Sequence, residues 1–177
     1  MSLLAEVLAA LDQAEVRYAL IGAMAMATYG VSRSTQDLDL FTVDSAVFAE
    51  SLWTPLRDAG CSVSILKGDS EDPLAGVVRS SRSGERPIDL VVGKFRWQRQ
   101  ALERSAPGRL GDVKIPILRA ADLILLKIYA GGPQDAWDIQ QMLNGGSREV
   151  LRQEVEERLA DLRPESRHFW QKILAGS

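Results

Sequence analysis

Strand-like patterns fill the first two thirds of this 177-residue chain, and helix-like patterns fill the last third. Short apolar or alternating stretches bounded by Gly, Pro and polar loops predict strands at 17–21, 37–41, 61–66, 76–81, 87–92 and 113–118. Helical spacing of apolar residues predicts helices at 3–14, 23–29, 46–59, 95–104, 120–129, 134–143, 148–162 and 165–174. The fold class is therefore α+β: a mixed β-sheet flanked by helices, with a C-terminal helical part.

The change of pattern near Arg119 marks the expected boundary between two parts of one unit. A chain of this length builds one good core and not two large domains. We therefore expect a core at 1–118 and a C-terminal helical subdomain, 119–177, packed on it. Pro116 interrupts the strand at 113–118, and this predicts an edge strand.

The composition excludes several classes of protein. No apolar run is long enough to span a membrane, and the acidic N-terminal stretch does not resemble a signal peptide, so a cytoplasmic protein without a membrane partner is expected. The single cysteine, Cys61, excludes an internal disulfide and a cysteine-based zinc cluster. The single histidine, His168, lies in the helical tail, and this argues against histidine-led catalysis.

The charges are unevenly distributed along the chain. Residues 1–78 hold 4 Lys/Arg and 11 Asp/Glu, 79–119 hold 10 and 4, and 120–177 hold 7 and 9, which gives nets of −7, +6 and −2. The basic middle segment indicates either an anionic partner met by one region or a solvated face balanced by acids elsewhere. The second interpretation is slightly favoured for any individual arginine.

Two aspartates, Asp37 and Asp39, lie one residue apart in the strand-like stretch GVSRSTQDLDLF. In a strand they lie on one face with Arg33 and Thr35, about 6.5–7 Å from neighbour to neighbour. Two carboxylates this close repel each other unless a cation intervenes. That cation is either Arg33 in an ion pair or a divalent metal, since Mg²⁺ prefers oxygen ligands.

A third carboxylate, Asp89, lies in the apolar strand pattern RPIDLVVG. A charge in such a strand needs a partner. Arg86 or Lys94 can provide it, but the presence of the first pair favours a shared metal site.

Gly22 and Ala23 form a tight turn between a strand and a helix. Small residues at such a turn let backbone N–H groups approach a phosphate, although an ordinary strand-to-helix turn has the same appearance.

The combined pattern is strand, Gly22-Ala23, helix, Arg33-x-Thr35-x-Asp37-Leu38-Asp39 and a later Asp89, and it resembles the nucleotidyltransferases of the DNA polymerase β superfamily. With the later stretch LILLKIYAGGPQDAWDI, it resembles more narrowly the AbiEii-like nucleotidyltransferases, which include toxins of type IV toxin–antitoxin systems and relatives that modify the acceptor end of tRNA.

The resemblance implies the nucleotidyltransferase fold and a role for each matching residue. Asp37, Asp39 and Asp89 would hold two Mg²⁺ ions, with Mn²⁺ as the alternative. Gly22, Ala23, Arg33 and Thr35 would bind a nucleoside triphosphate. Two departures weaken the match: Ala23 replaces the usual Gly or Ser, and Gln134 stands where relatives often have a basic residue.

Lys127 is a further candidate for the catalytic site. It lies five positions after Asp122 in a helix that is apolar nearly all round, about 140° away, so these two charges do not pair. A buried lysine then needs an anion from elsewhere, unless its ammonium reaches water. The resembling family has a late Lys and Asp, which correspond to Lys127 and Asp135. Asp135 either caps its own helix or orients Lys127.

The sequence thus predicts an enzyme, a metal-dependent nucleotidyltransferase that moves a nucleoside monophosphate from an NTP to an acceptor hydroxyl of RNA (tRNA-like) or protein. The resemblance also implies a cognate antitoxin as a partner. The alternatives are an antibiotic or small-molecule adenylyltransferase, a glycosyltransferase, and a non-catalytic nucleotide-binding module.

Overall fold

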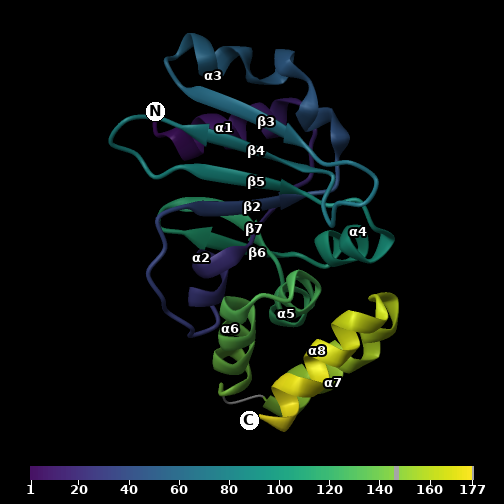
Figure 1. Ribbon diagram of the computed structural model, residues 1–177. Helices are drawn as coiled ribbons and strands as arrows, with labels where there is room; N and C mark the ends of the chain where they lie inside the picture. Colours follow the sequence, from purple (N-terminus) through teal and green to yellow (C-terminus); the bar gives the residue numbers. More distant parts are fainter. Residues whose placement is uncertain (146–147, 177) are drawn as a thin grey trace.

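The computed structural model describes residues 1–145 and 148–176. Its centre is a mixed sheet of seven strands in the order β3-β4-β5-β2-β1-β7-β6 (Figure 1). The strands are β1 (Ala19–Leu20), β2 (Leu38–Thr42), β3 (Ser62–Lys67), β4 (Gly76–Ser81), β5 (Ile88–Val92), β6 (Ala106–Leu110) and β7 (Val113–Ile117). The predicted α+β class and mixed sheet are confirmed.

Two strands at the centre of the sheet run parallel although they are distant in sequence. β2 pairs parallel with β5, and β1 pairs antiparallel with β2 and parallel with β7. The remaining pairs, β3–β4, β4–β5 and β6–β7, are antiparallel. Residues of β2 are thereby brought beside residues about 50 positions later in the chain.

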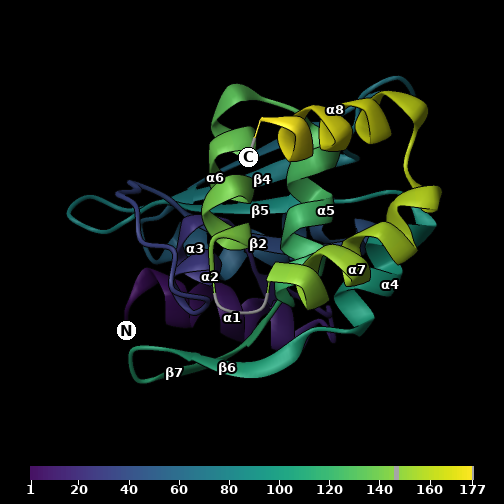
Figure 2. The same cartoon turned by 90° about the horizontal axis from the view of Figure 1, so that it is seen from below.

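Helices cover the sheet and form a group at one end of the molecule. α5 to α8 lie together on the side away from β3 (Figure 1), and the view from below shows the C-terminal end of α8 beside α6 (Figure 2). The helices are α1 (Leu3–Gln13), α2 (Gly22–Ala27), α3 (Thr54–Asp58), α4 (Arg96–Glu103), α5 (Ala120–Ala130), α6 (Pro133–Leu143), α7 (Arg148–Arg158) and α8 (Pro164–Ala175), with 3₁₀ segments η1 (Ser45–Phe48), η2 (Glu50–Trp53) and η3 (Leu159–Asp161).

One cluster of buried apolar side chains connects the sheet to the C-terminal helices. It includes Leu40 of β2, Ile124 of α5 and Trp170 of α8, all at most 2% exposed. In the described ranges, no helix combines the length and the apolar character needed to cross a membrane.

The helix predicted at 46–59 is wrong, because the segment is broken into η1, η2 and α3. Ala49 is extended, with ψ of 119°, and separates the two 3₁₀ turns. The indole of Trp53 donates to the carbonyl of Val47 at 2.7 Å and is fully buried. Pro55 has no N–H to continue a preceding helix, so it stands in the first turn of a new one.

The prediction that 113–118 is an edge strand is also wrong, because β7 lies between β1 and β6. The edge strand is β6, which the sequence did not predict because Pro107 and Gly108 are atypical of strands. Pro116 stands opposite Pro107, and β1 pairs with β7 through Leu20 and Ile117. β1 is too short to pair with Pro116, so the missing N–H of this proline breaks no hydrogen bond between β1 and β7.

Candidate functional site

Asp39 of β2 and Asp89 of β5 stand directly opposite each other in the parallel pair. Opposed residues in a sheet project from the same face, and neighbouring strands lie about 4.8 Å apart. Burial raises the pKa of Asp39, and the nearby charges of Asp89 and Asp37 raise it further. The two strands thus hold adjacent carboxylates that resist full ionisation.

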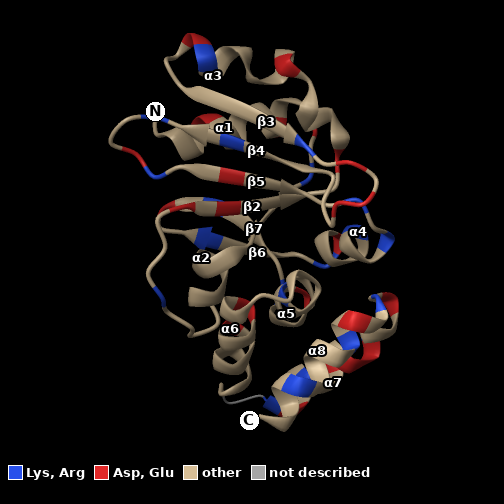
Figure 3. Cartoon of the chain, in the orientation of Figure 1, with Lys and Arg blue, Asp and Glu red and all other residues tan. Residues whose placement is uncertain are grey.

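Arg79 of β4 bridges the other carboxylates. Its Nη1 donates to Asp89 Oδ2 at 2.7 Å, and its Nη2 donates to Asp37 Oδ1 at 3.0 Å. Arg79 also stands opposite Asp89 in the β4–β5 register, so it lies on the same sheet face. Figure 3 shows the acidic segments of β2 and β5 side by side, with a basic segment of β4 next to them.

The carboxylates are of the ligand type that a hard divalent cation binds, but in the described residues they are not gathered around one point. Burial raises the pKa of Asp89 despite Arg79, and its Oδ1 is buried without a hydrogen-bond partner in the described part of the chain. Carboxylate oxygens are the ligands that Mg²⁺ prefers. Among residues 1–145 and 148–176, no three His, Cys, Asp or Glu side chains are gathered closely enough to hold an ion. Arg79 instead supplies the positive charge between Asp37 and Asp89.

Asp39 also packs tightly against the turn at Gly22. Gly22 begins α2 with a φ of +66°, and a Cβ built there would lie 2.0 Å from Asp39 Oδ2. Only glycine tolerates both this backbone conformation and this contact. The next residue, Ala23, is buried.

The loop before β2 carries Arg33, Thr35 and Asp37. The prediction that they continue the strand is wrong, since β2 begins at Leu38. The Thr35 hydroxyl donates to the carbonyl of Asp37 at 3.0 Å, so Thr35 shapes the approach to the carboxylates. Arg33 Nε lies 3.1 Å from Asp138 Oδ1, although its charge still lowers the pKa of Asp39.

Lys127 of α5 finds its anions on α6. Its Nζ lies 2.5 Å from Asp138 Oδ2 and 3.3 Å from Asp135 Oδ1. The second oxygen of Asp135 accepts from the Gly132 N–H at 3.0 Å, so this aspartate both caps α6 and contacts Lys127. The charge of Lys127 also lowers the pKa of Asp39.

The sequence interpretation missed Asp138, a fully buried carboxylate contacted by Lys127, Arg33 and Gln134. Its only sequence signal is its place one helical turn after Asp135, next to the apolar Ile139. Asp122 is likewise buried, but it pairs with Arg104 at 2.6 Å and belongs to a separate ion pair.

No protein-family model matches the sequence, and no curated protein is significantly similar to it. Solved structures do match the fold. ANT(2'')-Ia in complex with adenylyl-2''-tobramycin aligns with a TM-score of 0.56 at 16% identity, over 89% of this chain and 97% of that one. The solution structure of the same antibiotic-resistance factor gives 0.53 at 15% identity, over 89% and 91%. The lincosamide antibiotic adenylyltransferase LnuA, bound to lincomycin, gives 0.51 at 14% identity, over 80% and 94%.

The chain has the nucleotidyltransferase fold. At these identities the likeness concerns the fold, and the site must be judged on its own residues.

Within this nucleotidyltransferase fold, a cavity of about 260 Å³ opens beside Asp39. Its charged lining residues are Arg33, Asp39, Lys127 and Asp135, and Gly22 also contributes to the lining. The rest of the lining is mainly apolar and comes from β2, β5, α5 and the 73–74 loop.

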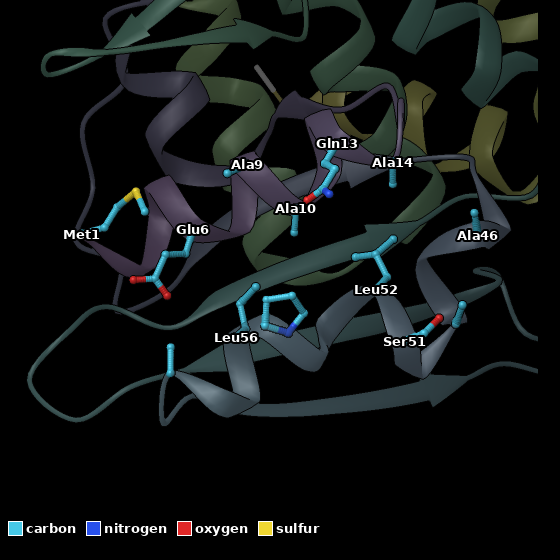
Figure 4. A pocket seen from close by; sticks show the side chains of 13 residues that line it. Met1, Glu6, Ala9, Ala10, Gln13, Ala14, Ala46, Ser51, Leu52 and Leu56 are labelled. Carbon is cyan, nitrogen blue, oxygen red and sulfur yellow. The ribbon is translucent and has the colours of Figure 1, made fainter.

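A larger hollow of about 740 Å³ lies elsewhere, between α1 and the segment from η1 to α3 (Figure 4). It is lined mainly by alanines, leucines and Pro55, and it shares no residue with the cavity beside Asp39. Its carboxylate, Glu6, is paired with Arg82 at 2.6 Å. This hollow is therefore separate from the carboxylate site.

Proposed function

We propose that the protein is a divalent-metal-dependent nucleotidyltransferase that moves a nucleoside monophosphate from an NTP to an acceptor hydroxyl. The observation that carries the proposal is the pairing of Asp39 with Asp89 on adjacent parallel strands, beside the glycine turn at Gly22. The nucleotidyltransferase fold supports it independently.

Asp37, Asp39 and Asp89 would hold the metal, two Mg²⁺ ions or alternatively Mn²⁺, after Arg79 has moved aside. When bound, such ions activate the attacking hydroxyl and neutralise the leaving pyrophosphate. In this proposal the core at 1–118 supplies the carboxylates, and the helical part at 119–177 supplies Lys127 and Asp135.

The remaining site residues would bind and orient the nucleotide. The N–H groups of Gly22 and Ala23 would donate to phosphate oxygens. Lys127 and Arg33 would offset phosphate charge, and Thr35 would hold the loop that carries Asp37.

Two acceptor classes follow from different observations. The AbiEii-like sequence pattern favours RNA or protein, with a cognate antitoxin as partner. The fold neighbours favour a small-molecule acceptor, since the chain covers 97% of ANT(2'')-Ia and 94% of LnuA. In the basic segment 79–119, Arg79, Arg82 and Arg104 are engaged by carboxylates of the chain itself, which leaves fewer of its cations for a polyanionic acceptor.

The test is incubation of the protein with each α-labelled NTP, Mg²⁺ or Mn²⁺, and three acceptor pools: total RNA, total protein and a panel of hydroxylated antibiotics. We expect label in one pool with the wild-type protein. Asp39→Asn and Lys127→Ala should remove it, whereas Asp58→Asn, an exposed carboxylate away from the site, should not. Label in none of the pools would contradict the proposal.

A further inference from the structure

Gln98 of α4 is a fully buried amide whose orientation is fixed by its neighbours. Its Oε1 accepts hydrogen bonds from the N–H groups of Lys94 at 2.8 Å and Phe95 at 3.0 Å. Two backbone donors require the oxygen at that position, so the amide nitrogen must point the other way. That nitrogen, Nε2, has no hydrogen-bond partner in the described part of the chain. A buried donor without a partner is uncommon in folded proteins and calls for an explanation.

Gln98 lines the same cavity as Asp39. The cavity floor continues the two carboxylate strands, since Phe41 and Val91 follow Asp39 and Asp89 by two positions and share their sheet face. Leu123 and Leu126 of α5 also contribute apolar lining. The cavity thus combines the charged groups beside Asp39 with a mainly apolar lining that carries two polar side chains, the amide of Gln98 and the hydroxyl of Tyr129.

We propose that the apolar part of this cavity binds the nucleobase of the NTP, and that Gln98 Nε2 donates a hydrogen bond to an acceptor atom on the edge of the base. The inference rests on the proposed function, because the carboxylate end would receive the phosphates. It makes Gln98 a specificity-determining residue.

Shape and polarity favour a base over the acceptor molecule. At about 260 Å³ the cavity is below the usual 300–1,000 Å³ of small-molecule sites, so it suits one moiety of a ligand and not a whole nucleotide. A planar heterocycle buries apolar faces and presents acceptor atoms at its edge. A polyhydroxylated acceptor would need several polar partners, whereas the mainly apolar part of the described lining offers only Gln98 and Tyr129.

The test compares the dissociation constants of each NTP and of inorganic tripolyphosphate, measured by calorimetry with Mg²⁺ and without acceptor. Tripolyphosphate has the phosphates but neither ribose nor base, so the ratio of the two constants reports the nucleoside, and a change of this ratio in a Gln98 variant reports the base site. Gln98→Glu keeps the oxygen that caps α4 and replaces the amide donor with an acceptor. Gln98→Met keeps the length of the side chain but removes both the donor and the oxygen that accepts from Lys94 and Phe95, so its folding is checked by circular dichroism. Gln100→Glu is the matched control, because Gln100 lies on the same helix but outside the cavity.

We expect the wild-type protein to bind its preferred NTP at least about tenfold more tightly than tripolyphosphate, in line with one good hydrogen bond and apolar burial. Both Gln98 variants should reduce this ratio about tenfold, and Gln100→Glu should leave it unchanged. Any repulsion by the new carboxylate of Gln98→Glu would weaken tripolyphosphate as well and so cancel in the ratio.

An unchanged ratio in folded Gln98 variants would overturn the inference. It would also be overturned if the variants kept the ratio but raised the KM of the acceptor, since the cavity would then belong to the acceptor. Transfer activity separates the two proposals. If the wild-type protein transfers nucleotide but the Gln98 variants leave the affinity ratio unchanged, only the base site is refuted. If the ratio depends on Gln98 but no transfer occurs, only the proposed function is refuted.

Discussion

Ionisation of Asp39 destabilises the folded protein. Burial and the charges of Asp89 and Asp37 raise its pKa, so the folded state holds a proton that the unfolded state releases. Stability is therefore greatest below the ordinary pKa of an aspartate and is lost as the pH rises through the raised pKa. We expect Asp39→Asn to raise the free energy of unfolding at pH 8 by about 1 kcal/mol, a modest single-substitution effect.

Urea unfolding at pH 8 and pH 4.5, in the presence of a chelator, measures this effect. The advantage of Asp39→Asn should be smaller at pH 4.5 than at pH 8, because the raised pKa makes the folded carboxyl take up its proton at a higher pH than the unfolded one does. Asp58→Asn, at an exposed position, should show little difference at either pH. A variant less stable than wild type at pH 8 would refute the interpretation.

Arg79 occupies the position that a divalent cation would need between Asp37 and Asp89. Its side chain is 43% exposed, so solvent screens these ion pairs and they oppose a bound ion only weakly. We expect Arg79→Ala to bind Mn²⁺ about fivefold more tightly, measured as loss of the free-ion signal in electron paramagnetic resonance. Arg109→Ala, at an exposed arginine of β6, should bind as the wild type does. Weaker binding by Arg79→Ala would show that Arg79 supports the ion instead of competing with it.

Among the elements, the turn between β1 and α2 depends on the absence of a side chain. Gly22 and Gly30 both have positive φ, of +66° and +86°, so alanine is strained at either position by about 1–2 kcal/mol. A Cβ at Gly22 also meets Asp39, whereas one at Gly30 meets nothing within 4 Å in the described chain. We expect Gly22→Ala and Gly30→Ala both to lower stability, but only Gly22→Ala to weaken NTP binding in calorimetry. Equal NTP affinities in the two variants would show that the turn at Gly22 does not contribute to NTP binding.

The contact between α5 and α6 relies on a buried ion pair. Lys127 is 12% exposed, and its partner Asp138 is fully buried. Lys127→Met should lower the free energy of unfolding by about 3 kcal/mol, because it leaves a buried carboxylate with reduced compensation. Adding Asp138→Asn should recover part of this loss, with a coupling energy of about 1–3 kcal/mol in a double-mutant cycle. The exposed pair of Arg152 and Glu156 provides the matched cycle, with about 0.3–0.5 kcal/mol expected. Equal couplings in the two cycles would contradict the importance of the buried pair.

Local chemistry explains which elements the sequence predicted. The strand of Asp39 and the hairpin that contains Asp89 have clear alternation and turn residues, and the structure forms both. The segment 46–59 has helical spacing, but the buried Trp53 and the position of Pro55 break it. β6 was missed because Pro107 and Gly108 are poor strand formers that pairing with β7 nevertheless accommodates.

Across the whole molecule, the site arises from pairings that sequence periodicity does not encode. Asp39 and Asp89 are 50 positions apart, and their opposition depends on the sheet order. The sequence interpretation reached this pair through the cost of a charge in an apolar strand and through a family resemblance, and not through spacing. No sequence pattern pointed to Arg79 or Gln98. Arg79 reaches the carboxylates across two strands, and Gln98 is distinguished only by a buried amide nitrogen without a hydrogen-bond partner in the described chain.

The continuous core predicts that the two parts of the chain unfold together. Buried apolar side chains form one continuous cluster from α1 through the sheet to α8, and this cluster extends from residues 1–118 into the described helices that follow. Trp53 lies in the first part and Trp170 in the second, and both are at most 2% exposed. We expect variants that keep either Trp53 or Trp170, with the other tryptophans replaced by Phe, to show the same urea midpoint in fluorescence as in far-UV circular dichroism. Each single-tryptophan variant is compared with its own circular dichroism curve, so the destabilisation caused by the replacements does not affect the comparison. A lower fluorescence midpoint at Trp170 would mean that the C-terminal helices unfold independently, and Lys127 would then belong to a part of the site that can detach from the carboxylates.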